Sequence, residues 1–508
     1  MSTSLILHWQ GRPTRGEAGA VLDGLAPLTD RYELVLGDRR ANTATYLDTV
    51  DWRLRRRGLV LSQQGSTLVL NGSTEARTTT LTEAPAWPAR LEQIAPGPVR
   101  DGLADAMWIR AVAPKVRSRT VTRDVAVLND DGKTVARLEW TESAGLEPVK
   151  TDPLVRVTLR PLRGCRRDAD RVARALLRTE WFTSAEDTVV DELLDAAGLG
   201  EDEAPPAITA DMPADVAVAT ALLGFADEIR DNLDGTIDDV DTEFLHDLRV
   251  AVRRTRSLLK VVGDVLPSRL AERYAPRFKW VGDLTTPTRD LDVYLLELDD
   301  LARSLTVGEQ ADLDPFRTHL HKELAKERRA LVRGLRSQRF VRLLDGWRAA
   351  LTTVIENGRS PLTARELGAD RIRRVAKHVV RKARAITPGS PAEHVHALRK
   401  RCKELRYMLE VFRPLAPPET YRTVLKDLKR LQDVLGAFQD GEVQSEKLRV
   451  YAHDMLEGEH PPAATLLAMG ELLSRFVRQE REARDDLTGA LATFLGPKTH
   501  ARIEGLLP

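Results

Sequence analysis

Cationic side chains recur at helical spacing in one segment of this sequence and again 150 residues later. The members of the first row are His246, Arg249, Arg253, Arg256 and Lys260. At ~100° per residue, an α-helix holds them within an arc of roughly 80°. Guanidinium groups bind phosphate oxygens in pairs, ammonium groups act as point charges, and histidine hydrogen-bonds an anion. The row therefore has the chemistry of a site for a polyanion.

The second row repeats the first position by position. Its members are His396, Arg399, Lys403 and Arg406, with Lys400 beside them. Apolar positions repeat as well and point away from the cations, towards a core. The matches are Leu248 with Leu398, Val252 with Cys402, and Leu259 with Leu409.

The same offset continues without a gap through Phe278–Val293 and Leu428–Val443, where Lys279 aligns with Lys429. A repeat of this length predicts two similar half-bundles related by a pseudo-two-fold axis. Their cationic rows, called the two ridges from here on, are then expected to face each other across a groove or central channel. His378, in a further basic segment, is a candidate beside them.

Like charges in a row repel one another unless something neutralises them. The alternative to a polyanion site is a helix face exposed to solvent, or one whose cations pair with aspartates at repeat positions. These aspartates are Asp290, Asp440, Asp283 and Asp433. We expect some of them to hold arginines in place.

Cations one helical turn (~5.4 Å) apart suit a repetitive polyanion, so DNA, RNA and inorganic polyphosphate all qualify. Base stacking needs aromatic rings among the cations. Only Tyr407 is close, and it lies off the ridge. The pattern therefore favours inorganic polyphosphate and keeps single-stranded nucleic acid as an alternative.

The 508 residues include 77 Lys plus Arg and 76 Asp plus Glu, a formal charge of +1. No bulk basicity demands a nucleic-acid or membrane partner. Two cysteines, Cys165 and Cys402, exclude a disulfide framework and a Cys-rich zinc site. No apolar run approaches the ~20 residues of a membrane helix, and the first residues lack a secretory signal. We expect a cytoplasmic protein without membrane contact, metal or cofactor.

The spacing of apolar residues changes along the chain, from a strand-like to a helix-like repeat. Residues 1–200 read as an α+β domain with an antiparallel sheet, 201–210 as a linker, and 211–508 as helical, with halves at about 211–360 and 361–508. Asp-Gly within Asn129–Lys133 predicts a hairpin between Arg119–Leu128 and Thr134–Trp140. Further expected strands are Leu5–Gln10, Tyr32–Leu36, Thr67–Leu70 and Leu154–Leu159. The expected helices are Asp168–Glu180 and Glu186–Ala197.

After the linker, apolar residues recur at three and four, which indicates long antiparallel helices with short connections. Breaks between these helices are expected at Pro267, Pro287, Gly308, Pro361, Pro388 and Pro417–Pro418.

The helical part resembles the CHAD family, roughly over residues 211–500. Four motifs carry the resemblance: LHDLRVAVRRTRS (Leu245–Ser257), WVGDLTTPTRDLDV (Trp280–Val293), VHALRKRCKELRYMLE (Val395–Glu410) and LKRLQDVLGAFQD (Leu428–Asp440). The resemblance implies a pair of four-helix bundles with a basic central pore that binds inorganic polyphosphate and can place its carrier on polyphosphate granules. It assigns the ridge residues to this site, together with Lys279 and Lys429. Glu404 departs from the repeat, since the first copy has Arg254 there.

The first part resembles a CYTH domain, the tunnel-shaped β-fold of triphosphate-processing enzymes, through TYLDTVDWRLRRRGLVL (Thr45–Leu61). Asp48, Arg117, Arg119 and Glu139 stand where family members also carry charge. Family enzymes open with a strand of alternating glutamates and a lysine, whereas this chain has LILHWQ. Metal-assisted hydrolysis needs such carboxylates and cations.

We therefore expect a degenerate CYTH-like domain and a non-catalytic protein. Asp48 and Glu139 are then structural or weak-binding groups. The alternative is a metal-dependent triphosphatase, whose release of phosphate would disappear when Asp48 or Glu139 is mutated.

Overall fold

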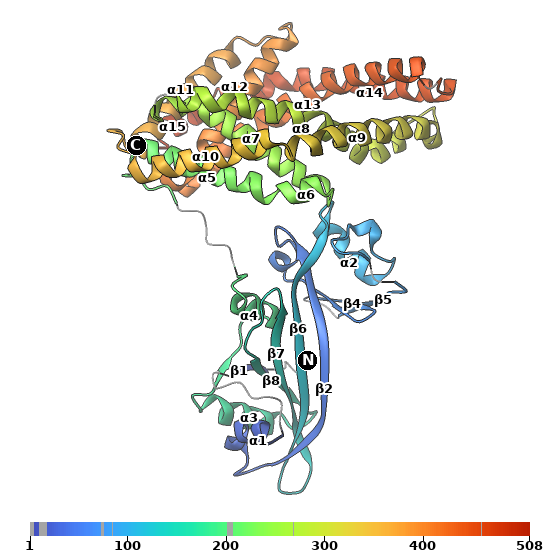
Figure 1. Cartoon of the computed structure of the whole chain (residues 1–508), viewed down its shortest axis with the longest axis vertical. Coiled ribbons are helices and arrows are strands. Elements are labelled where there is room, and N and C mark those ends of the chain that lie inside the picture. Colours follow the sequence, from blue (N-terminus) through green and yellow to red (C-terminus); the bar gives the residue numbers. More distant parts are fainter. Residues whose placement is uncertain are drawn as a thin grey trace. The chain divides into compact units, whose positions relative to one another are not determined.

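Two units divide the chain, Met1–Ala204 and Pro205–Pro508. The computed structural model describes residues 5–9, 18–72, 76–83, 85–200, 207–267, 269–458 and 460–507. Gln10 of the expected first strand and residues 201–206 of the expected linker lie outside the described residues. The predicted fold class is confirmed, since one unit is built on an antiparallel sheet and the other is helical (Figure 1).

Alternating polar and apolar residues build the sheet of the first unit. In the part of this unit that the structure describes, the strand order is β5–β4–β3–β2–β6–β7–β8–β1–β9. The bounds are β1 Leu5–Trp9, β2 Glu33–Thr49, β3 Val60–Gln64, β4 Thr67–Asn71, β5 Arg77–Thr80, β6 Val112–Leu128, β7 Thr134–Glu147, β8 Leu154–Pro161 and β9 Phe182–Ser184. Val125, Leu138 and Trp140 are buried in one core with Val172 and Leu176 of the helix that follows β8.

The hairpin predicted at Asn129–Lys133 is confirmed. β6 and β7 pair as far as Leu128 and Thr134, and Gly132 closes the turn at φ +70°, its N–H 2.8 Å from the Asn129 carbonyl. The strand expected over Tyr32–Leu36 is much longer, because β2 continues to Thr49 through exposed residues 37–42. Pairing with β6 sustains this stretch without a buried face of its own.

The helices of the first unit are α1 Ala18–Gly24, α2 Pro98–Met107, α3 Arg166–Leu177 and α4 Val189–Ala196. The two predicted helices are confirmed as α3 and α4. Thr188 caps α4 by accepting the N–H of Asp191, and Gly198 follows its end at φ +67°. The sequence interpretation missed α2. The three arginines Arg55–Arg57 form a single 3-10 turn.

The helical unit repeats its element bounds at the offset seen in the sequence. Its helices are α5 Ala214–Asp231, α6 Leu233–Ile237, α7 Thr242–Val262, α8 Leu270–Arg303, α9 Asp314–Leu335, α10 Gln338–Asn357, α11 Ala364–Arg384, α12 Ala392–Val411, α13 Pro418–Gly458, α14 Ala463–Phe494 and α15 Pro497–Glu504. α7 begins at residue 242 and α12 at residue 392, and the 3-10 turns after them span 263–265 and 413–415. Equivalent positions therefore lie on equivalent helices.

All but one of the predicted breaks are confirmed, since they fall between helices or at the first residue of one. The break at Pro287 is wrong, because α8 runs through both Pro276 and Pro287. Side chains supply hydrogen bonds next to this proline: the Gly282 carbonyl accepts one from Thr286 Oγ1 at 2.7 Å and one from Arg249 Nη1 at 3.3 Å. α8 therefore continues past a residue whose local preference is to end a helix.

Two apolar cores stabilise the helical unit. The larger one draws on both halves of the repeat, including Leu248 and Leu398. Cys402 is buried in it, as its equivalence to Val252 predicts. The second core lies among the distal parts of α8, α9, α13 and α14, which project together in Figure 1. No described helix has both the length and the apolar composition needed to cross a lipid bilayer.

Candidate anion-binding site

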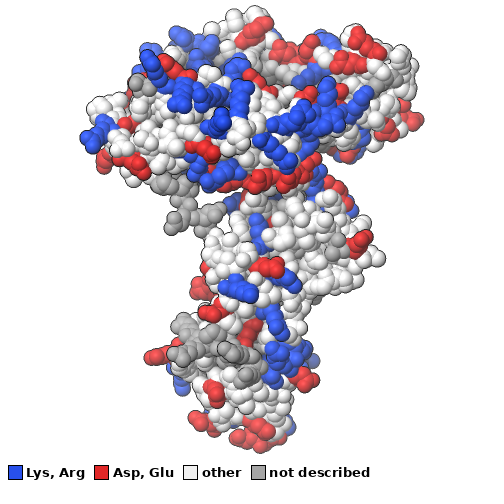
Figure 2. Space-filling model, viewed as in Figure 1, with Lys and Arg blue, Asp and Glu red and all other residues white. Residues whose placement is uncertain are grey.

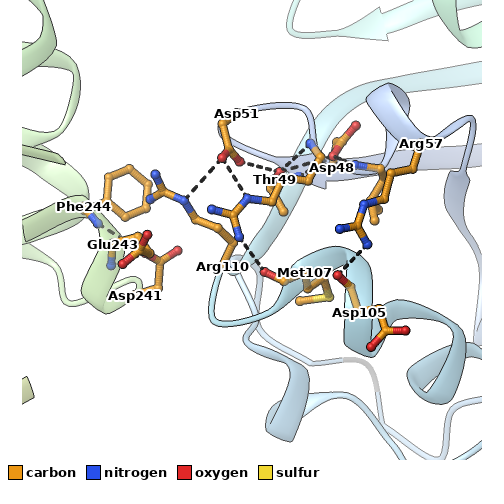
Figure 3. Close-up of polar contacts among 12 residues, drawn as sticks. Asp48, Thr49, Asp51, Arg57, Asp105, Met107, Arg110, Asp241, Glu243 and Phe244 are labelled. Carbon is orange, nitrogen blue, oxygen red and sulfur yellow. Dashed lines mark hydrogen bonds and ion pairs between the residues drawn. The ribbon is translucent and has the colours of Figure 1, made fainter. Parts of the chain in front are cut away.

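The first ridge lies on α7, whose start is set by Asp241. The Asp241 carboxylate accepts the backbone N–H groups of Glu243 at 2.9 Å and Phe244 at 3.3 Å (Figure 3). This N-cap satisfies donors that the first helical turn leaves free. The apolar positions that match the second copy are buried, so the opposite side of α7 carries the ridge, as the sequence predicts.

Arg249 is held against α8 by neutral acceptors. Its Nη1 donates to Thr285 Oγ1 at 2.8 Å and to Thr286 Oγ1 at 2.9 Å. Burial and the charge of Arg253 lower the pKa of Arg249 to about 10, so the guanidinium remains charged near neutral pH. Its buried Nε has no hydrogen-bond partner among the described residues. The side chain is thus oriented without being neutralised.

His246 is a neutral donor rather than a cation. Its Nδ1 lies 3.0 Å from Nη2 of Arg289. A guanidinium group can only donate, so Nδ1 accepts and the ring proton lies on Nε2. Burial and the charges of Arg289 and Arg253 lower the pKa of His246 to about 4. His246 therefore offers a neutral N–H to an anion at physiological pH.

The second ridge, on α12, uses the same positions with different partners. His396 Nδ1 is hydrogen-bonded to Oε1 of Gln439, the repeat equivalent of Arg289. An amide oxygen only accepts, so this imidazole donates from Nδ1, the reverse of His246. Arg399 Nη2 lies 3.8 Å from Oδ1 of Asp440. The two ridges are therefore equivalent in position and different in hydrogen bonding.

The two ridges act on each other electrostatically through Arg253 and Lys403. Burial, Arg399 and Arg253 lower the pKa of Lys403 to about 8, so the charges of the two copies act on each other. Neither Arg253 nor Lys403 has a carboxylate at ion-pair distance among the residues that the structure describes.

Arg253 and Lys403 are repeat equivalents, and so are Pro213 and Thr363, which form an isolated antiparallel bridge. A contact between equivalent residues is what a two-fold relation predicts close to its axis. The Pro213–Thr363 bridge is therefore consistent with the predicted pseudo-axis between the halves.

Besides Arg399, which lies 3.8 Å from Asp440, three of the predicted site cations are paired with carboxylates. The pairs are Lys260 Nζ with Glu404 Oε1 at 2.6 Å, Lys279 Nζ with Asp283 Oδ2 at 2.6 Å, and Arg406 Nε with Glu410 Oε1 at 2.7 Å. Their charges are already compensated, so they are less suited to an anion than the sequence pattern suggests. The row members without a carboxylate at ion-pair distance among the described residues are Arg249, Arg253, Arg256, Lys400 and Lys403.

Arg256, Lys400 and Lys429 have no ion pair within the described ranges. Nη1 of Arg256 lies against Gly282 of α8, where an added Cβ would approach it to 2.7 Å. Lys400 and Lys429 are exposed. Arg256 therefore belongs to the inner part of the first ridge, and the two lysines lie at the surface.

Two of the four aspartates expected as partners do pair with predicted site cations, Asp440 with Arg399 and Asp283 with Lys279. Asp290 instead pairs with Lys447, at 2.5 Å. Asp433 is exposed and has no ion pair within the described part of the chain. Pairing with these aspartates therefore leaves the centre of the ridges charged.

His378 lies on α11, which packs against α12. Desolvation and the cations Arg381 and Arg401 lower its pKa, and neither cation is a ridge member.

Figure 2 shows how unevenly charge is spread on one face of the helical unit, where Lys and Arg gather in broad patches and Asp and Glu line one margin. The near-zero net charge therefore conceals strong local separation of charge.

In the first unit, Asp48 is a structural residue. Its carboxylate accepts the backbone N–H groups of Thr49 at 2.7 Å, Leu54 at 3.0 Å and Arg55 at 3.0 Å, around the turn that follows β2 (Figure 3). Burial raises the pKa of Asp48.

Glu139 Oε2 pairs with Arg160 Nη2 at 3.1 Å. The described residues contain no group of three or more His, Cys, Asp or Glu side chains able to hold a metal ion.

Sequence interpretation missed Arg289, which fixes the proton of His246, and the two threonines that orient Arg249. A signal for Arg289 exists in the repeat, because 43 residues separate both hydrogen-bonded pairs, His246 with Arg289 and His396 with Gln439. No comparable signal marks the threonines, whose role depends on how α7 meets α8.

Residues 220–449 match a family model described as the CHAD domain. Two curated relatives, each an uncharacterized protein from a strain of Mycobacterium tuberculosis, are 32% identical to this chain over 218 residues. The match covers 40% of this chain and 39% of each relative, so the chain spans about two fifths of the length of the curated relatives it matches.

Among solved structures, the CHAD domain from the plant Ricinus communis is 25% identical with a TM-score of 0.49, over 57% of this chain and 94% of that one. PptA from Streptomyces chartreusis is 20% identical with a TM-score of 0.41, over 55% of this chain and 99% of that one. A putative adenylyl cyclase from Hippeastrum, described as having a dominant triphosphatase activity, is 10% identical with a TM-score of 0.27, over 38% of this chain and 96% of that one.

Proposed function

Since residues 220–449 form a CHAD domain, as the motifs predicted, we propose that the helical unit binds inorganic polyphosphate between its two ridges, without catalysis. One observation carries the proposal: the charges of Arg253 and Lys403 act on each other across the two halves, and neither side chain has a carboxylate at ion-pair distance among the described residues. Half-buried like charges destabilise a fold by themselves. A chain of phosphates between them turns that repulsion into attraction on both sides.

The donor set suits phosphate oxygens along an extended anion. Arg249 is oriented by neutral hydroxyls and keeps its charge, and His246 adds a neutral N–H. Arginine can grip two oxygens at once, and lysine contributes a point charge. The ridges lack aromatic side chains for stacking bases, which supports inorganic polyphosphate over nucleic acid. By the same binding, the protein is proposed to be held at polyphosphate granules.

The direct test is a titration of the full chain with long-chain polyphosphate over a series of salt concentrations. About five cations that each neutralise a phosphate give a slope of roughly −3 to −4 for the logarithm of the binding constant against that of salt. Single-stranded RNA and DNA serve as competitors at equal phosphate concentration. Absence of binding, or displacement of polyphosphate by either nucleic acid at equal concentration, contradicts the proposal.

Polyphosphate affinity is expected to fall as the pH rises through the pKa of Lys403, which is about 8. Above that pH the free amine carries no charge, so the central contact loses its attraction for phosphate. His246, with a pKa of about 4, contributes no change in this range. Titrations at about pH 7 and about pH 9, at constant ionic strength, measure the effect.

The matched control is Lys403→Arg, because a guanidinium stays protonated across this range. The variant is expected to bind with nearly the same affinity at both pH values. An equal loss of affinity in the wild type and in Lys403→Arg would show that another group titrates, and would place Lys403 outside the contact.

A further inference from the structure

Three arginines and a tryptophan line one cleft between α8 and α10, apart from the ridges. The cleft measures about 460 Å³ and is lined by Arg277, Trp280, Arg339, Arg342 and Leu343. The guanidinium carbon of Arg339 lies 3.9 Å from the centre of the Trp280 ring. Leu343 is buried and supplies an apolar floor. The cleft therefore joins positive charge to an aromatic surface.

No carboxylate lines this cleft. Arg339 and Arg342 have no ion pair or hydrogen bond to a side chain within the described residues. Both lie near the start of α10, whose first turn carries no acidic residue, so the helix dipole adds to their positive potential. Three cations without a counter-charge are unfavourable in the empty cleft and favourable once an anion enters.

The cleft is on the other side of α8 from the first ridge. Gly282 of α8 lies against Arg256 of α7, whereas Trp280 meets Arg339 of α10. Two residues along a helix are about 200° apart around its axis. A ligand in this cleft is therefore separated from the ridges by the body of α8.

We propose that this cleft binds a nucleotide, with the base stacked on Trp280 and the phosphates held by the arginines. Its volume falls within the roughly 300–1,000 Å³ of small-molecule sites and exceeds the need of one phosphate. An aromatic ring beside cations is the arrangement that stacks a base while gripping its phosphate. The ridges, which bind phosphates alone in the proposal above, have no such ring.

The test is calorimetric titration of the full chain with ATP, ADP, adenosine and inorganic tripolyphosphate. The ridge variant Arg253→Met/Lys403→Met serves as the background, so that phosphate binding between the ridges does not contribute. In this background ATP is expected to bind at least tenfold more tightly than tripolyphosphate, because stacking adds to the phosphate contacts. Adding Trp280→Leu or Arg342→Ala is expected to weaken ATP binding roughly tenfold or more.

Arg449→Ala is the control, because Arg449 is an exposed arginine of α13 whose ion-pair partner among the described residues is Glu446 of its own helix. It is expected to leave ATP affinity unchanged. Arg342 is exposed, so its variant tests the cleft even where Trp280→Leu disturbs packing. Tripolyphosphate binding as tightly as ATP, ATP affinity unchanged in Arg342→Ala, or no nucleotide binding at all would each overturn the proposal.

Discussion

Replacing Arg253 and Lys403 together by methionine is expected to weaken binding of long-chain polyphosphate about 100-fold without loss of folded stability. A hydrogen bond to a charged group contributes about 1.5–3 kcal/mol, and about 1.4 kcal/mol corresponds to a factor of ten. Methionine keeps an apolar side chain of similar length and removes the charge. Because the two cations act unfavourably on each other in the free protein, the thermal unfolding midpoint is expected to stay constant or to rise.

A matched control removes two arginines that already have partners. Arg422 and Arg449 are exposed on α13, and each pairs with a glutamate of the same helix. Arg422→Met/Arg449→Met changes the net charge by the same amount and is expected to alter polyphosphate affinity less than threefold. Unchanged binding by the ridge variant would move the site away from the pseudo-axis. A drop in unfolding midpoint together with binding would make the two cations structural.

The positions of the ridges could be predicted because they depend on the spacing of residues along single helices. The offset of 150 residues and the three-to-four spacing placed the ridges on equivalent helices, and the structure keeps both. The compensation of individual charges could not be predicted. Lys260 continues the first ridge in sequence, yet it pairs with Glu404, 144 residues away. Only the packing of α7 against α12 brings these two together.

The sheet unit shows a second limit. The sequence signals a strand where residues alternate between a buried and a more exposed face, and residues 124–128 of β6 and 136–142 of β7 follow that rule. The middle of β2 buries neither face, so its extent depends on hydrogen bonds to β6. Pro287 shows a similar limit in the helical unit, because α8 continues through a proline that local rules expect to end a helix.

Two ion pairs between the halves occupy equivalent positions of the repeat, with the cation and the carboxylate exchanged. Arg254 Nη2 lies 3.3 Å from Glu410 Oε2, and Lys260 Nζ lies 2.6 Å from Glu404 Oε1. Positions 254 and 404 are repeat equivalents, and so are 260 and 410. Two first halves packed together would place Arg254 against Lys260, and two second halves would place Glu404 against Glu410. The charges therefore favour pairing of unlike halves.

Glu404→Arg is expected to lower the free energy of unfolding of the helical unit by about 3–5 kcal/mol, the cost of leaving a buried charge without its partner. Only 8% of the Glu404 side chain is exposed. The substitution also places a new cation beside Lys260 and beside Arg401, which pairs with Glu404 as well. Urea unfolding followed by circular dichroism, to which the helical unit contributes most, measures the loss.

Adding Lys260→Glu to this variant rebuilds an ion pair with the polarity of Arg254 and Glu410, and is expected to recover about 1–2 kcal/mol. The recovery is partial because Arg401 keeps a like charge beside it. Lys260→Glu alone is expected to destabilise by about 1 kcal/mol, since 59% of the Lys260 side chain is exposed and water screens the contact. Lys260→Glu is therefore expected to destabilise the protein when residue 404 is glutamate and to stabilise it when residue 404 is arginine. If the two changes simply add, the contact does not couple the halves, and their pairing depends on the apolar core alone.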